Sequence, residues 1–308
     1  DALKFGLGYG NITSTLRWNH LFNNKLFSNT TLTYSRYAFD TDFGVNSTTN
    51  ILTGNEIYDI GFGYMSGIKD YAGRIDFDYS PNPNHNLKFG YSYTHHHFFP
   101  GETSLNLNFS TADSLANFTL DTLLNFSERI NAQEMFAYLE DNVKITDRLK
   151  ANIGIHCGYY SLDKFSLQPR FSARYLLNEN SSIKLSYADM KQNIHLLSNS
   201  SVGFPSDLWL PAIDSVPSQS SKQIAASVNT ILEGFDFLHP ILNENSKLEL
   251  SIEAYYKTMS NLITYKAGYS NLENTESWEN SIETGGKGES YGLELFLQKK
   301  TGRTTGWI

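Results

Sequence analysis

The sequence has little cysteine, proline or positive charge, and each shortage excludes a class of protein. A single cysteine among 308 residues, Cys157, excludes an intrachain disulfide. Because it shares parity with Ile153 and Ile155, we expect a small buried apolar side chain rather than a nucleophile. Only 8 prolines leave room for long strands. A formal net charge of -8 provides no basic field for phosphates, so we expect no nucleic-acid partner.

Long apolar runs are also missing, and no stretch approaches the ~18 residues that a membrane-spanning helix needs. The chain opens at Asp1 without an initiator methionine and shows no signal peptide. It stops in "GRTTGWI", a stretch that resembles the start of a further strand. We therefore expect a piece of something longer.

What the sequence does have is alternation between apolar and polar residues. In "PRFSARYLLNENSSIKLSYADMKQ" (169–192), Phe171 and Tyr175 share one parity, and Arg170 and Arg174 share the other. A period of two predicts strands with one apolar face, here joined by a tight Asn-Glu-Asn-Ser turn. Roughly a dozen segments repeat this pattern, and their lengths fit or exceed the ~9–11 residues of a membrane-crossing strand.

The joins between these segments alternate in length. The short polar turns are NNK, PNPNHN, ITDR and NENS, whereas stretches such as 40–56, 101–128 and 195–221 are long and polar. Short periplasmic turns and long extracellular loops are typical of an all-β, antiparallel transmembrane barrel. Only a closed sheet satisfies every backbone group in hydrocarbon, so we expect apolar residues toward lipid and polar residues toward the lumen. A soluble β-sandwich is disfavoured because it has no reason to sort its loops by length.

Several stretches, in this order, carry a family resemblance: "NHNLKFGYSYTHHHFFPG", "MFAYLEDNVKITDRLKANIGIH", "LQPRFSARYLLNENSSIKLSYADMKQNIHLL", "FPSDLWLPA" and "GKGESYGLELFLQKKTGRTTGWI". From about Asn11 to the end, the chain resembles the barrel of TonB-dependent outer-membrane receptors. The resemblance implies a 22-stranded barrel, an N-terminal plug and energy from a TonB complex. The plug, its energy-coupling box and the last strand of the family have no counterpart in these residues. We therefore expect 1–308 to be a partial barrel domain with no plug domain, from the middle-to-late part of the barrel.

Four residues are candidate ligand contacts at loops or the barrel rim. His95 and His97 lie two positions apart on a strand and share a face, with His96 pointing away. A pair without a third ligand is a weak metal signal, so we predict no metal site and favour rim histidines. Trp209 either stacks on a ligand or anchors the loop to the strand, and we favour the anchor. Trp278, in a polar loop, is expected to be exposed and is a candidate for ligand contact.

Other residues suggest no chemistry of their own. The lumen parity carries Arg74, Asp76, Asp78, Arg170 and Arg174, which we expect to meet a plug or water. No G-x-S-x-G elbow, P-loop, H-E-x-x-H or C-x-x-C occurs, so we predict no enzyme and no cofactor. The "DTDFG" that begins at residue 40 lacks the rest of a calcium-binding loop.

The resemblance implies energy-coupled uptake of a scarce solute, such as an iron-siderophore, cobalamin, or a glycan or peptide. The expected partners of the protein are outer-membrane lipid, the TonB complex (through a plug) and the small solute. The expected location is a Gram-negative outer membrane. A passive porin predicts an open lumen instead. A barrel enzyme or an adhesin predicts hydrolysis, or host binding without uptake. The identity of the solute depends on long loops that vary freely.

Overall fold

The computed structural model describes residues 2–51, 54–111, 117–126, 128–197, 208–232, 247–267, 278–301 and 304–308. Almost all of its elements are strands, as the alternation predicts. The elements are β1 (Ala2–Asn23), β2 (Leu26–Ile51), β3 (Gly54–Asn82), β4 (His85–Thr111), β5 (Asn117–Phe126), β6 (Ile130–Lys144), β7 (Leu149–Tyr160), β8 (Lys164–Leu176), β9 (Ser181–Gln192), β10 (Ile194–Leu197), β11 (Leu208–Pro211), β12 (Gln219–Leu232), β13 (Leu248–Tyr265), the 3-10 helix η2 (Trp278–Ser281), β14 (Ile282–Lys299) and β15 (Gly306–Trp307).

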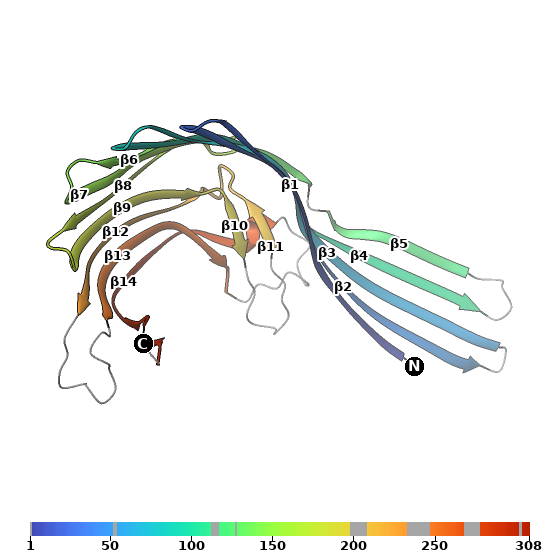
Figure 1. Ribbon diagram of the computed structural model, residues 1–308. Helices are drawn as coiled ribbons and strands as arrows, with labels where there is room; N and C mark the ends of the chain where they lie inside the picture. Colours follow the sequence, from blue (N-terminus) through green and yellow to red (C-terminus); the bar gives the residue numbers. More distant parts are fainter. Residues whose placement is uncertain are drawn as a thin grey trace.

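Thirteen of these strands form one antiparallel sheet in the order β1-β2-β3-β4-β6-β7-β8-β9-β12-β13-β14-β15, with β5 paired to β4. The sheet bends into an arch that does not close on itself (Figure 1). It is therefore the wall of a partial barrel, which confirms the predicted fold class. Among the described residues, no helix is long and apolar enough to cross a membrane.

The register places the two parities on opposite faces of this wall. Phe171 pairs with Ile153 and Tyr187, and all three lie on the outer, convex face. The neighbouring Ser172 pairs with Asn152 and Ser186, and these three line a hollow on the concave face. Of the outward set, Phe171 is 38% exposed, Tyr175 45% and Leu185 43%. No second layer covers these apolar side chains, as expected of a face that contacts lipid.

The long joins are long in sequence, as predicted, but most of their described residues extend strands rather than form loops. β2 and β3 stay paired without a break from Leu26 opposite Tyr79 to Ile51 opposite Gly54. β4 and β5 also pair, from Glu102 opposite Phe126 to Ser110 opposite Asn117, with one register shift after Thr103. Both hairpins therefore project well beyond the rest of the arch (Figure 1). Backbone pairing needs no apolar face in water, so polar residues such as threonine can sustain a strand there.

One join on the side of the long loops is short: that between β7 and β8 takes only residues 161–163, an exception among joins predicted to be mostly long. The expectation of a buried Cys157 is corrected. Cys157 pairs with Leu167 on the outer face and is half-buried, because no other described part of the chain packs over it there.

The buried core lies not within the sheet but where residues 193–197 and 208–218 pack against its concave side. One cluster contains Leu197, Leu208, Leu210, Val216, Trp278 and Ile282. A second contains Ile68, Phe98, Ala132, Tyr160 and Ala212. In the second cluster, Ile68 and Phe98 lie at sequence positions whose side chains face the concave side and are elsewhere polar. These positions are apolar here, where Ala212 packs against them.

Candidate functional site: a hairpin seated inside the barrel wall

Residues 193–197 and 208–218, here called the hairpin segment, fold back beneath the arch (Figure 1). Their strands β10 and β11 pair from Ile194 opposite Pro211 to Leu197 opposite Leu208. β11 contacts β3 and β4, whereas β10 contacts β13. The hairpin segment therefore joins parts of the wall that lie far apart in the sheet order, and it occupies part of the concave space.

Apolar side chains seat the hairpin segment on both sides. Leu210 is fully buried and Val216 is 1% exposed, and both pack in the cluster that holds Trp278. Ala212 is fully buried in the other cluster, against Phe98 and Tyr160 of the wall. Burying a side chain the size of leucine or valine contributes about 1.5–3 kcal/mol. This packing fixes the segment to the wall as part of the fold.

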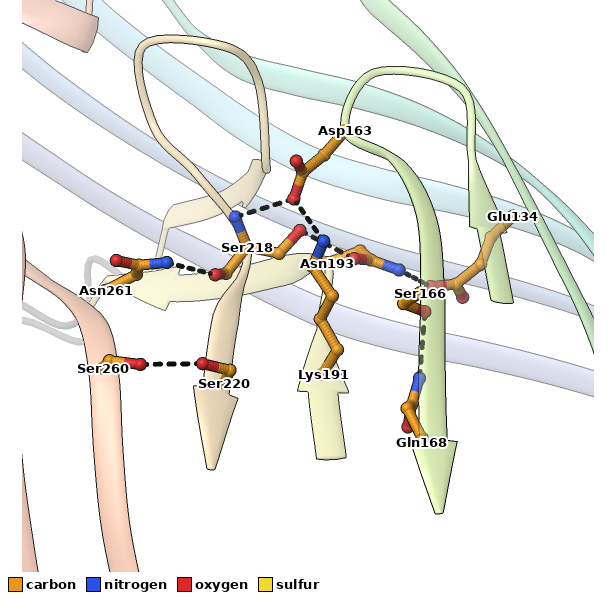
Figure 2. A network of polar contacts seen from close by, with 10 residues as sticks. All are labelled: Glu134, Asp163, Ser166, Gln168, Lys191, Asn193, Ser218, Ser220, Ser260 and Asn261. Carbon is orange, nitrogen blue, oxygen red and sulfur yellow. Dashed lines mark hydrogen bonds and ion pairs between the residues drawn. The ribbon is translucent and has the colours of Figure 1, made fainter. Parts of the chain in front are cut away.

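A polar network, shown in Figure 2, holds the base of the segment through Asn193 and Ser218. The Asn193 side-chain amide donates to Glu134 Oε1 on β6 at 2.7 Å, and Ser218 Oγ donates to Asn193 Oδ1 at 2.7 Å. The Ser218 backbone N–H donates to Asp163 Oδ2 at 3.0 Å, and Lys191 Nζ lies 3.1 Å from the same oxygen. Both Asn193 (5% exposed) and Ser218 (1%) are removed from water, so these bonds are costly to lose.

His96 continues this network into the wall. Its Nδ1 lies 2.8 Å from Asp70 Oδ1, and its Nε2 lies 3.6 Å from Glu134 Oε2. The imidazole is 3% exposed, and each ring nitrogen faces a carboxylate. We call Asp70, His96, Glu134, Asn193, Ser218, Asp163 and Lys191 the anchor network. It links β3, β4, β6, β9 and the 161–163 turn to the hairpin segment.

His195 lies inside the hairpin segment and has a different environment. It is fully buried and lies opposite Leu210. Burial lowers the pKa of His195 to about 4, against smaller opposing effects of the Asp163 carboxylate and of the Val216 backbone. The imidazole is therefore neutral while the segment is seated.

Two buried histidines, His96 and His195, were not predicted from the sequence. For His96 only a direction was predicted, away from His95 and His97, because its carboxylate partners lie 26 and 38 positions away in sequence. Parity provides a signal, since His96 and Asp70 both fall on the polar parity and pair directly across β3 and β4. No local signal marked His195 as buried.

The predicted His95–His97 pair does share a face, with ring centroids 4.3 Å apart. His97 Nδ1 is hydrogen-bonded to Asn131, and its ring meets the edge of Tyr71 at 5.9 Å. Within the described ranges, no group of three or more His, Cys, Asp or Glu residues could hold a metal ion. The geometry fits histidines that contact neighbouring strands, and their ligand role stays a prediction.

The two predicted tryptophans occupy different environments. Trp209 on β11 is half-buried, meets Tyr37 edge-on at 6.4 Å and also lines a hollow on the concave face. It is thus placed to anchor the segment, as favoured from the sequence, and its ligand role stays a prediction. Trp278 is 6% exposed within an apolar cluster, so the expected exposed indole is wrong. The polar sequence around Trp278 concealed this burial, because its apolar neighbours come from the hairpin segment.

Two adjoining hollows on the concave face bring several predicted charges together. The first, of about 580 Å³, includes Trp209, Lys191 and Arg170 in its lining. The second, of about 620 Å³, includes Arg74, Tyr138 and again Arg170. Arg170 Nε is buried without a hydrogen-bond partner among the described residues, so it has an unused donor between the two hollows.

The remaining predicted charges are paired or lie elsewhere on the same face. Arg74 Nε lies 2.7 Å from Asp76 Oδ2, and the Tyr138 hydroxyl donates to Asp76 Oδ1 at 2.6 Å. Asp78 accepts from Asn86 at 2.6 Å. Arg174 lies apart from these, in a third hollow near the turn end of the sheet.

An arched antiparallel wall with an apolar convex face and a polar, partly occupied concave face defines a segment of an outer-membrane-type barrel. The chain belongs to the TonB dependent receptor-like β-barrel family, whose model matches residues 4–307. No curated protein matches the chain.

Solved structures agree on the fold at low sequence identity. The siderophore receptor PirA from Pseudomonas aeruginosa is 12% identical, with a TM-score of 0.52 over 97% of this chain and 57% of that one. The ferric-catecholate import receptor Fiu from E. coli K12 is 13% identical, with a TM-score of 0.55 over 96% and 46%. The RagAB peptide importer in its open-open state is 9% identical, with a TM-score of 0.59 over 96% and 34%. The chain thus spans between about a third and three fifths of these relatives.

Proposed function

We propose that this chain is the solute-capturing wall of an outer-membrane receptor that takes up a scarce solute with energy from TonB. The observation that carries the proposal is the hairpin segment, which is seated inside the wall by buried apolar residues and by the anchor network. A passive pore needs an open lumen, whereas here part of the concave space is filled. A partly occupied lumen supports a path that must be opened before a large solute can pass, and this fits energy-coupled uptake better than a passive pore.

The hollows beneath the hairpin segment fit a capture site. Trp209 supplies an aromatic face, and Arg170 supplies a buried donor without a partner. The named relatives include receptors for siderophores and an importer of peptides, and their range supports uptake without fixing the solute. In this proposal the chain lies in a Gram-negative outer membrane, contacts lipid with its convex face, and reaches the TonB complex through a plug domain.

The test compares growth of the producing strain with that of a deletion strain, with one nutrient limiting at a time. The nutrients are a ferric siderophore, cobalamin, an oligosaccharide and an oligopeptide. We expect a defect for one class, and we expect loss of TonB or collapse of the proton-motive force to reproduce it. Uptake that survives both treatments would assign the protein to the passive channels instead.

A further inference from the structure

A row of positive side chains crosses the wall near its turn end. Lys144 on β6 pairs with Lys150 on β7, Lys150 pairs with Arg174 on β8, and Arg174 pairs with Lys184 on β9. We call these four residues the cation row. All four line one hollow of about 480 Å³ on the concave face. At ~4.8 Å between neighbouring strands, the row is about 14 Å long.

This arrangement costs stability unless something compensates it, because like charges directly opposite on neighbouring strands repel. Lys144 Nζ has a partner in Asp147, 2.6 Å away in the adjoining turn. Within the described part of the chain, no carboxylate forms an ion pair with Lys150, Arg174 or Lys184. The protein as a whole is acidic, with a net charge of -8, so the row is a local exception.

The carboxylates nearest in register do not neutralise the row. Lys184 pairs with Ser227, and only beyond that serine does Glu253 follow on β13. Glu253 also lines this hollow, two strands beyond Lys184, and it pairs with Glu294 on β14, so the two signs are separated along the same line of the sheet. The positive and negative side chains are therefore segregated, and the cation row is left free to bind a partner.

Neutral donors lie in the next line of positions above the row. Asn152 donates to Asn142 at 2.8 Å, and Ser172 and Ser186 continue the line on β8 and β9. All four line the same hollow. Amides and hydroxyls beside ammonium and guanidinium groups are the donors that bind carboxylates in charge-assisted hydrogen bonds.

We propose that the cation row binds an acidic polypeptide segment that lies across β6 to β9. In an extended chain, alternate side chains on one face are spaced by about 6.6–6.8 Å, so two or three carboxylates match a row about 14 Å long. A single small anion contacts one or two of these cations and leaves the others repelling each other. Register and charge carry this proposal, which does not depend on uptake.

The test uses the purified protein in detergent micelles at low salt and a fluorescently labelled ten-residue peptide of alternating Glu and Ser. A Gln-Ser peptide of the same length serves as the uncharged control. Anisotropy titration is expected to show binding of the acidic peptide alone. We expect the triple variant Lys150→Gln, Arg174→Gln, Lys184→Gln to weaken binding about tenfold or more, since exposed ion pairs contribute modestly but add along a row.

A matched variant, Lys222→Gln, Lys266→Gln, Lys287→Gln, removes the same charge outside the row and should bind like the parent. The melting temperature of the row variant should stay equal or rise, because repulsion is removed. If the triple variant does not fold, the single variant Arg174→Gln, at an exposed residue, is used instead. We expect it to weaken binding of the acidic peptide about threefold. Unchanged affinity of a folded row variant would overturn the proposal. Displacement of the peptide by an equal concentration of pyrophosphate would also overturn it and assign the row to small anions.

Discussion

Replacing Asn193 with alanine should release the hairpin segment from the wall while leaving the barrel folded. The side chain makes two hydrogen bonds, a part-buried one to the charged Glu134 and a buried one from Ser218. A bond to a charged group contributes about 1.5–3 kcal/mol and a neutral one about 0.5–1.5 kcal/mol. The two together predict that the packed position of the hairpin segment is destabilised by roughly 2–4.5 kcal/mol relative to the released one; we call this difference the free energy of seating. At about 1.4 kcal/mol per factor of ten, a 3 kcal/mol loss raises the open population more than a hundredfold.

Hydrogen exchange measured by mass spectrometry on peptides that cover 208–218 reports this opening directly. The Ser218 amide hydrogen bonds to Asp163 outside the segment, so this bond is lost on release. The amide hydrogens of Ala212 and Val216 bond within the segment, where both residues are buried only while it is seated. The control is Asn152→Ala, which removes one side-chain bond to Asn142 on the wall and touches no residue of the segment. The reasoning is refuted if Asn193→Ala leaves protection of 208–218 unchanged, or if Asn152→Ala lowers it as much.

Two further predictions concern the same segment. Burial holds the pKa of His195 at about 4, and release of the segment restores about 6.5. The free energy of seating is therefore constant above pH 6.5 and decreases as the pH falls below it, because the released state binds the proton more readily. By pH 5 seating should lose about 2 kcal/mol, measured as faster exchange of 208–218 after correction for intrinsic rates, and His195→Gln should abolish the dependence. Leu210→Ala leaves a cavity in a fully buried site and should cost about 2–5 kcal/mol, seen as a red shift of Trp278 emission. An unshifted spectrum together with normal protection would contradict that burial.

The face of the sheet on which each side chain lies could be predicted from the sequence, because it depends only on the alternation of neighbouring residues. Phe171 and Ser172 differ by one position, and the pleat alone sends them to opposite sides of the sheet. The pairing of strands joined by short turns also follows from the sequence, as for β8 and β9. The neighbours β4 and β6, and β9 and β12, are not consecutive and could not be predicted in this way. The strand extension through 40–51 and 54–56 was not predicted because polar residues in water show no apolar period.

The hairpin segment could not be predicted because its burial depends on distant partners. Its stretch is rich in serine and proline and has the composition of a loop, yet Leu210 and Val216 are buried. The wall offered one neglected clue, since Ile68 and Phe98 are apolar at positions of the polar parity. Apolar residues on a lumen face indicate that something covers them, although they do not identify which part of the chain does so.

The apolar convex face of this wall is expected to contact lipid, and the polar concave face to contact water. A nitroxide label placed in turn at each position from 170 to 175 tests this alternation, in a Cys157→Ser background, with the protein reconstituted in lipid vesicles. We expect positions 171, 173 and 175 to be accessible to oxygen and positions 170, 172 and 174 to a water-soluble nickel chelate. Equal accessibility along the strand, or the opposite alternation, would contradict the account.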